Sequence, residues 1–174
     1  MLDRLRVGGR AARRGGGAGG GDATPPGFTL RGLDGRAVTS TALRGKIGVV
    51  HFWFTTCAGC LLELPEFQAF VDAHAGAPDV VITSVHSGGR AEEVAAWMRE
   101  GGHRFEVLMD DGYSERAGVR SFPTTWFLDP EGRLRLVAEF GTSRHLREEF
   151  AWRIEALRER GRADEQVAKR GGAG

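Results

Sequence analysis

Residues 46–67 read KIGVVHFWFTTCAGCLLELPEF and contain both cysteines of the 174-residue chain, Cys57 and Cys60. The stretch opens on a nearly unbroken run of β-branched and aromatic residues, 46–54, which is typical of a strand buried on both faces. A helix is expected to follow the cysteines. The pair therefore lies in the turn at the carboxyl end of a buried strand, where α/β folds place their functional sites.

The spacing of the two cysteines favours redox chemistry. Side chains three positions apart in a helical turn project about 60° apart on one face, so they can close a disulfide ring. The unpaired N–H groups and the positive dipole end of the first turn stabilise a thiolate at Cys57, which is the nucleophilic form. Cys60 lies one turn deeper. This asymmetry predicts that Cys57 attacks a disulfide and Cys60 resolves the mixed disulfide.

A metal site is the main alternative for a C-x-x-C pair. A structural zinc site needs four ligands, and the chain contains no second C-x-x-C motif. The histidines are scattered along the sequence: His51, His74, His86, His103 and His145. No metal is therefore expected. His51 is interpreted as a half-buried strand residue, with tuning of the thiols as the alternative role.

Strand and helix patterns alternate along the rest of the chain. Residues 28–40, FTLRGLDGRAVTS, predict a β-hairpin that turns at Asp34-Gly35. Strands that alternate with helices indicate a mostly parallel sheet with helices on both faces. Further strands are expected at 79–86, 105–110, 124–129 and 133–140, and helical segments at 89–102, 113–118 and 142–160.

Composition divides the chain into three segments. Residues 1–26 are expected to form a disordered arm, because eight of the first 21 residues are glycine and apolar residues are few. One ordered domain should cover 27–160. Residues 161–174 are expected to form a flexible C-terminal tail.

Charge and hydropathy set limits on partners and compartment. The net charge of +1 gives no general case for nucleic acid or an anionic membrane. No apolar run approaches the ~20 residues of a membrane span, and no apolar signal-peptide region is visible. The chain as written is therefore expected in the cytoplasm, with an extracytoplasmic location as the alternative if the true N-terminus is missing. A lone cytoplasmic C-x-x-C pair is normally reduced, which favours a redox role over a permanent cross-link.

Two segments resemble a known family. VVHFWFTTCAGCLLELPEF (49–67) resembles the active-site segment of TlpA/ResA-like thioredoxin-fold proteins, and VRSFPTTWFLDPEGRL (119–134) resembles their second signature, which contains a cis-proline. The resemblance spans about 28–158. It implies an α/β thioredoxin-like fold with a central mixed β-sheet, helices on both faces and an N-terminal β-hairpin extension.

The same resemblance implies a function. The chain should be a thiol–disulfide oxidoreductase that exchanges electrons with protein disulfides through Cys57-Ala-Gly-Cys60, with no cofactor beyond this redox-active disulfide. The expected partners are protein thiols and disulfides together with an upstream or downstream redox partner, and the expected state is a monomer. One departure is Thr56, which stands where the family usually has a tryptophan immediately before the first cysteine.

The second signature supplies the expected substrate-binding residues. The Phe122–Pro123 bond is predicted to be cis and to pack against the cysteine turn, which leaves the Phe122 backbone available to pair with an extended peptide. Thr124, Trp53 and Thr56 complete the predicted set of substrate contacts. Trp53 lies on a strand, however, and that position favours a core residue over a substrate contact.

Glu63 is the remaining predicted catalytic residue. It follows Cys60 by three positions and shares a helical stripe with Phe67 and Phe70, so it should face inward. A buried carboxylate can exchange a proton near neutral pH, which predicts that Glu63 acts as general base for Cys60. The alternative is a surface carboxylate that pairs with a lysine or arginine.

Two other functions remain open from the sequence. A peroxiredoxin-like thiol peroxidase shares the fold, and Thr-Thr-Cys loosely resembles a peroxidatic site, but peroxiredoxins have a P-x-x-x-T-x-x-C pattern and no proline lies close before Cys57. A copper-binding assembly factor of the thioredoxin fold would have a C-x-x-x-C motif with a distant histidine. The spacing between Cys57 and Cys60 is one residue shorter.

Overall fold

The computed structural model of the protein describes residues 23–139 and 145–171. The strands and helices expected within this part of the chain are present close to their predicted positions. In chain order they are β1 (Thr29–Gly32), β2 (Ala37–Thr39), the 3-10 helix η1 (Ser40–Leu43), β3 (Ile47–Trp53), α1 (Ala58–Ala73), β4 (Val80–His86), α2 (Ala91–Glu100), β5 (Val107–Met109), α3 (Tyr113–Arg116), β6 (Thr124–Leu128), β7 (Leu134–Glu139) and α4 (Leu146–Gly171).

The strands form one mixed sheet of seven strands in the order β2-β1-β5-β4-β3-β6-β7. β3 pairs with β4 and β4 pairs with β5 in parallel, while the other neighbours are antiparallel. The predicted mixed thioredoxin-like sheet is confirmed, but the expectation of a mostly parallel sheet is wrong. The two hairpins β1-β2 and β6-β7 add antiparallel pairs, and β6 enters beside β3 in the opposite direction.

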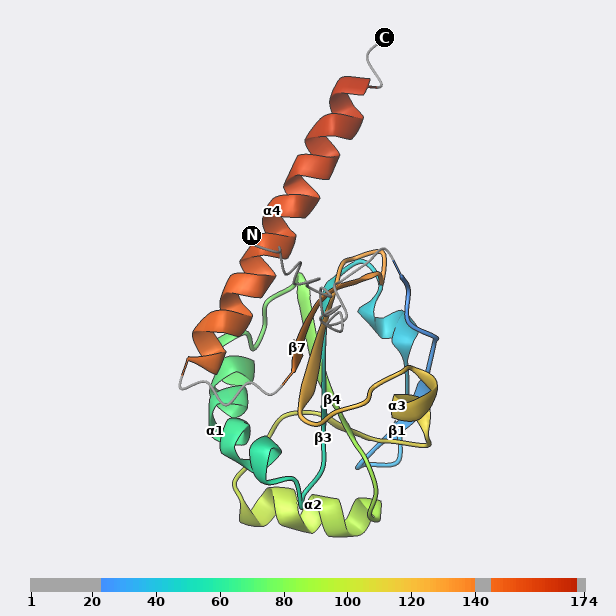
Figure 1. The fold of residues 1–174 in the computed structure, drawn as a ribbon, viewed down its shortest axis with the longest axis vertical. Coiled ribbons are helices and arrows are strands. Elements are labelled where there is room, and N and C mark those ends of the chain that lie inside the picture. Colours follow the sequence, from blue (N-terminus) through green and yellow to red (C-terminus); the bar gives the residue numbers. More distant parts are fainter. Residues whose placement is uncertain (1–22, 140–144, 172–174) are drawn as a thin grey trace, which may run out of the picture.

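β3 lies at the centre of this sheet, and all seven of its residues are buried. Its side chains alternate between two apolar cores: Val49 and Trp53 belong to one, Val50 and Phe52 to the other. The first core is covered by α1, α2 and α4, and the second by η1, α3 and the segment around Phe28. Figure 1 shows α1 and α4 on one side of the sheet and α3 on the other.

Residues 23–26 lie against the domain. The Ala23 carbonyl accepts a hydrogen bond from the Leu134 N–H at 2.9 Å, and the Pro26 carbonyl accepts one from the Tyr113 hydroxyl at 3.0 Å. A segment with few apolar side chains can be anchored through its backbone carbonyls, which prolines also have. Residues 23–26, which are predicted to belong to the arm, are therefore hydrogen-bonded to the domain. The rest of the predicted arm, 1–22, lies outside the described residues.

α4 continues to Gly171, through residues predicted to form a flexible tail. Figure 1 shows its C-terminal half projecting beyond the sheet. A glycine such as Gly161 costs a helix only about 1 kcal/mol, and the residues after it are mostly good helix formers. Acidic residues in the first turn and basic residues in the last also suit the helix dipole. Its buried residues all precede this extension: Leu146, Phe150, Ile154 and Leu157.

Candidate redox site

Cys57 and Cys60 are joined by a disulfide, with their Cα atoms 5.2 Å apart. Cys57 is the N-cap of α1, and its Sγ accepts a hydrogen bond from the Cys60 N–H at 3.1 Å. The residue is 8% exposed, whereas Cys60 is 0% exposed. The structure thus shows the predicted asymmetry in placement: Cys57 lies at the helix terminus and is slightly exposed, and Cys60 lies inside the helix and is fully buried.

Pro123 lies against the cysteine turn. The Phe122–Pro123 peptide bond is cis, as predicted. A Cβ atom added to Gly59 would lie 3.5 Å from the Pro123 Cδ, which is an ordinary van der Waals contact. The two family signatures therefore meet at the N-terminus of α1, although they are more than sixty residues apart in the sequence.

This geometry predicts that Gly59→Ala stabilises the protein. The added methyl gains helix propensity of up to about 1 kcal/mol and meets Pro123 without a clash. Urea denaturation should show a higher free energy of unfolding. Gly161→Ala is the matched control, because a Cβ there meets no atom within 4 Å and reports propensity alone. If Gly59→Ala clearly lost stability while Gly161→Ala gained it, the added methyl at position 59 would clash, and the prediction would be wrong.

Two of the predicted substrate contacts lie at the surface beside the disulfide. Thr56 is exposed, and Phe122 is half-buried with its ring edge-on to Phe54 at 5.3 Å between centroids. The hydrogen-bonded pairing of β6 with its neighbours begins at Thr124, so Phe122 precedes the ladder. An extended peptide could approach this edge next to Cys57.

Trp53 and Thr124, two of the predicted substrate contacts, have their side chains in the interior of the domain. Trp53 is 0% exposed, and its indole N–H donates to the Ser84 Oγ at 3.1 Å. Thr124 is 2% exposed, and its hydroxyl donates to the Ser121 carbonyl at 2.8 Å. Strand alternation directs the indole into the core, and the threonine hydroxyl closes a local turn instead of facing a ligand.

Glu63 faces inward, as predicted, and is 3% exposed. The buried residues of α1 follow helical spacing: Cys60, Glu63, Leu64, Phe67 and Phe70. The carboxylate therefore shares a stripe with the buried cysteine, one turn further along the helix. This placement excludes the alternative of a surface carboxylate.

His51 is fully buried, which corrects its interpretation as a half-buried residue. Its Nδ1 is hydrogen-bonded to the Thr125 Oγ1 at 2.8 Å, and its ring stacks on Phe67 at 4.3 Å between centroids. Burial lowers the pKa of His51 to about 3, so the imidazole is neutral at physiological pH. The central strand therefore tolerates this histidine as an uncharged core residue.

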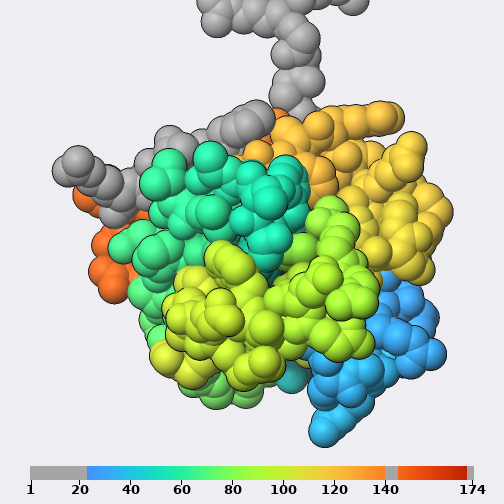
Figure 2. All heavy atoms as spheres, turned by 90° about the horizontal axis from the view of Figure 1, so that it is seen from below, coloured from blue at the N-terminus to red at the C-terminus, as the bar shows by residue number. Residues whose placement is uncertain are grey.

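His86 reaches the cysteine turn from β4. Its Nε2 accepts a hydrogen bond from the Thr55 N–H at 3.1 Å, two residues before Cys57. Figure 2 views this end of the molecule, and the teal segment after β3 adjoins the lime-green segment that includes the end of β4 and α2. In the sequence, His86 is one of five scattered histidines, and it is not among the predicted site residues. Its position at the end of the second buried strand was the available signal, because parallel neighbours end at the same edge.

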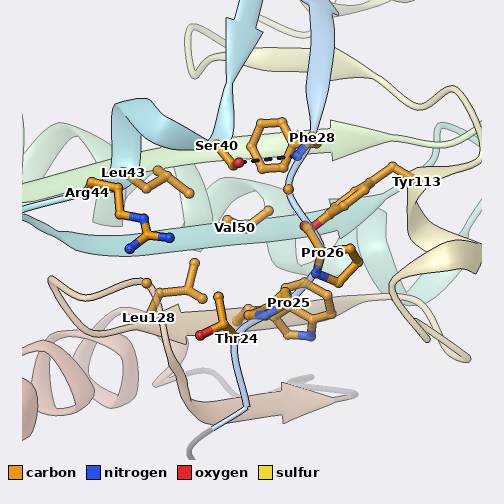
Figure 3. Close-up of a pocket in the computed structure, with 13 residues that line it drawn as sticks. Thr24, Pro25, Pro26, Phe28, Ser40, Leu43, Arg44, Val50, Tyr113 and Leu128 are labelled. Atoms are coloured by element: carbon orange, nitrogen blue, oxygen red, sulfur yellow. Dashed lines mark hydrogen bonds between the residues drawn. The ribbon is translucent and has the colours of Figure 1, made fainter.

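A separate hollow lies on the opposite face of the sheet (Figure 3). It has a volume of about 180 Å³, and its walls include Phe28, Val50, Tyr113 and Trp126, which belong to the second core. The cysteines and Pro123 are not among the residues that line it. The hollow is therefore distinct from the redox site.

Within residues 23–139 and 145–171, no group of three or more His, Cys, Asp or Glu side chains is arranged to hold a metal ion. In the same part of the chain, no helix combines the length and apolar character needed to cross a bilayer.

The fold and the site together define a thioredoxin-fold protein of the TlpA/ResA-like class, with a disulfide-forming C-x-x-C pair at a helix N-terminus and a cis-proline beside it. A model of the AhpC/TSA family matches residues 21–137, more than half of the chain. The chain belongs to the AhpC/TSA family.

Similar curated proteins agree with this class. The thioredoxin-like protein YneN of Bacillus subtilis (strain 168) is 30% identical over 109 residues, which cover 62% of this chain and 64% of that protein. The thiol-disulfide oxidoreductase ResA of the same strain is 31% identical over 115 residues, covering 63% of this chain and 62% of that protein. The chain thus spans somewhat less than two thirds of the length of these relatives.

Solved structures show the same fold. The structure of MTB DsbF in its mixed oxidized and reduced forms has a TM-score of 0.63 and 27% sequence identity, and covers 75% of this chain and 94% of that one. The crystal structure of StoA from Bacillus subtilis has a TM-score of 0.58 at 24% identity, covering 67% of this chain and 90% of that one.

Proposed function

We propose that the protein is a thiol–disulfide oxidoreductase that exchanges electrons with protein disulfides through Cys57 and Cys60. The arrangement of the two sulfurs is the observation that carries this proposal. Cys57 is the N-cap of α1 and is 8% exposed, in a position where first-turn N–H groups favour a thiolate, and Cys60 is fully buried within disulfide-bonding distance. The similarity to ResA supports the same reaction class.

The reaction consists of two exchanges. The Cys57 thiolate attacks one sulfur of a substrate disulfide, a Cys57–substrate disulfide forms, and the other substrate sulfur leaves as a thiolate that takes up a proton. The Cys60 thiolate then attacks the Cys57 Sγ, which forms the intramolecular disulfide and releases the second substrate thiol. The substrate gains two electrons and two protons, and the protein is oxidised by the same amount. A dithiol partner restores the reduced pair by the reverse exchange.

The surrounding residues have assigned roles in this proposal. Glu63 acts as general base that takes the proton from Cys60 before the second exchange. The Phe122 backbone pairs with an extended substrate segment, and the Pro123 ring holds that segment beside the cysteine turn. Thr56 also contacts the substrate, because it is exposed and immediately precedes Cys57.

Partners and compartment complete the proposal. The substrates are protein thiols and disulfides, and a second redox protein restores the pair. Both sulfurs come from one chain, so a monomer suffices for the reaction. The redox state in cells reports the compartment: acid quenching followed by alkylation should find free thiols if the protein works in the reducing cytoplasm and the disulfide if it works outside.

Reduction of insulin by dithiothreitol, followed as turbidity, tests the proposed activity. Catalytic amounts of the protein should shorten the lag before precipitation, and the oxidised protein without dithiothreitol should have no effect. Peroxide consumption and copper titration run in parallel address the other two functions. Rapid thiol-dependent peroxide consumption without insulin reduction would favour the peroxidase, and tight copper binding by the reduced protein would favour the assembly factor.

A further inference from the structure

His86 links the end of β4 to the turn that carries Cys57. Its Nε2 accepts the Thr55 N–H at 3.1 Å, and its Nδ1 lies 3.0 Å from the Gly88 carbonyl oxygen. A carbonyl can only accept a hydrogen bond, so Nδ1 carries the proton and Nε2 is the bare acceptor. Both bonds are satisfied only by the neutral imidazole. The residue is 1% exposed, and its ring is edge-on to Trp53 at 4.8 Å between centroids.

The turn has few other long-range anchors among the described residues. The Cys57 N–H donates to the Phe54 carbonyl within the turn, and the Trp53 carbonyl accepts the Ser87 N–H at 3.0 Å just before it. Thr55 is therefore the point where the turn itself is tied to a neighbouring strand. The segment between β3 and α1 sets the direction of the Cys57 Sγ, so a change at Thr55 displaces the nucleophile.

We propose that His86 is a positioning residue whose neutral imidazole holds the Thr55–Cys57 turn for attack on a disulfide, and that its protonation releases the turn. This inference deepens the proposed function and rests on it only for the kinetic part of the test. A protonated imidazole has N–H on both nitrogens, so Nε2 would face the Thr55 N–H donor to donor. The hydrogen bond would then be replaced by repulsion.

The pH range of this release depends on the charged and titratable groups around His86. Asp110 at the end of β5 donates its backbone N–H to the His86 carbonyl, while its carboxylate accepts from Ser87. At the start of α2, Arg90 and Glu93 pair with each other. The facing groups of β3 and the turn, Trp53 and Thr55, carry no charge. His103 is further from His86: its ring stacks on Trp97, which in turn contacts Trp53. The Cys57 thiol becomes a further titrating group after reduction.

Burial is the largest cause that lowers the pKa of His86 below 6.5. When the turn is released, His86 is exposed and has the pKa of an ordinary histidine, which is higher than its pKa in the anchored state. The sign of the pH dependence follows from this difference. The anchored turn is fully favoured above about pH 6.5 and is progressively lost as the pH falls toward the lowered pKa of the anchored state.

Two substitutions separate the two hydrogen bonds of His86. Glutamine reaches as far as Nε2 and offers a carbonyl oxygen that accepts the Thr55 N–H at every pH. Asparagine reaches only as far as Nδ1, so it can donate to the Gly88 carbonyl but cannot reach Thr55. Both variants lose a similar part of the buried ring, which makes each the control for the other.

The first measurement is a ¹H–¹⁵N NMR titration of the oxidised protein, in which the cysteines do not titrate. The Thr55 amide should shift with the same midpoint as the His86 ring in the wild type, should not titrate in His86→Gln, and should exchange rapidly with solvent in His86→Asn. A Thr55 amide that is unaffected by His86 ionisation in the wild type would overturn the proposal. This readout stands even if the protein fails to reduce insulin.

The second measurement is the rate of the first attack of the reduced protein on Ellman's reagent, an aromatic disulfide. At neutral pH, His86→Asn should react about fivefold more slowly than His86→Gln, the rate equivalent of one neutral hydrogen bond. Below the pKa of His86 the wild type should fall from the Gln rate toward the Asn rate. Protonation of Cys57 also lowers the rate of attack at acid pH, but this decrease is common to all three proteins. Equal rates for the two variants at all pH values would overturn the proposal.

Discussion

Replacing Cys57 with serine is expected to abolish insulin reduction, a loss of at least about 10³-fold. A serine hydroxyl is not ionised at neutral pH and cannot form a mixed disulfide, so the first exchange has no nucleophile. Cys60 cannot take over, because it is 0% exposed and lies inside α1, three residues after Cys57. The measurement is the initial rate of insulin reduction, with thermal midpoints of the reduced proteins as the control for folding.

Cys60→Ser is the matched variant, and it should behave differently. Cys57 remains able to attack, but the mixed disulfide cannot be resolved from within the chain. The variant should therefore accumulate covalent complexes with substrate proteins, visible as higher-mass bands on non-reducing gels that dithiothreitol removes. In the reduced wild type, iodoacetamide should label Cys57 before Cys60 at neutral pH. Complexes trapped by Cys57→Ser and absent from Cys60→Ser would reverse the two roles.

The centre of the fold and the location of the site could be predicted because both depend on local sequence patterns. The apolar run that becomes β3 and the C-x-x-C turn after it form one continuous stretch, and strand burial places that turn at the sheet edge. The cis bond before Pro123 and the inward position of Glu63 were also predictable, the first from the family signature and the second from helical spacing. These features need no knowledge of how distant segments pack.

The differences from expectation arise from strand geometry, from contacts between segments and from competition between weak preferences. Trp53 is among the predicted substrate contacts although its position on a strand favours the core, and the pleat of β3 does direct it into the core. Residues 161–171 stay helical because the cost of Gly161 is smaller than the summed propensity of the residues around it. The bond between Thr55 and His86 joins residues 31 positions apart and depends on the register of two parallel strands, of which the sequence indicates only that both end at the same edge of the sheet.

Glu63→Gln should slow the second exchange by about 10²-fold and leave the first nearly unchanged. Glutamine keeps the size and the hydrogen-bonding shape of the side chain but cannot accept a proton from a thiol. Cys60 is buried on the same helical stripe, so solvent bases reach its proton poorly. The first exchange depends on Cys57 at the helix terminus, where the unpaired N–H groups already favour the thiolate.

Ellman's reagent separates the two steps in one stopped-flow trace. Attack by Cys57 releases the first aromatic thiolate and leaves the other half bound to Cys57; attack by Cys60 on the Cys57 Sγ then releases the second and forms the Cys57–Cys60 disulfide. In Glu63→Gln the first phase should match the wild type within a few-fold, while the second should be strongly retarded. The retardation should shrink as the pH rises, because hydroxide then ionises Cys60 directly.

Glu66→Gln is the matched control, because it removes a carboxylate from the same helix at a less buried position. It should leave both phases intact. Urea denaturation of the two variants tests whether Glu63 contributes only packing: a stability loss at Glu63 with both phases unchanged between about pH 6 and 9 would make it a structural residue. If the second phase is slowed in Glu63→Gln but not in Glu66→Gln, and if it recovers at alkaline pH, then a group must remove a proton from Cys60. Neither a change in packing nor a general loss of stability produces that combination, because each would act on both phases and would not diminish as hydroxide becomes available.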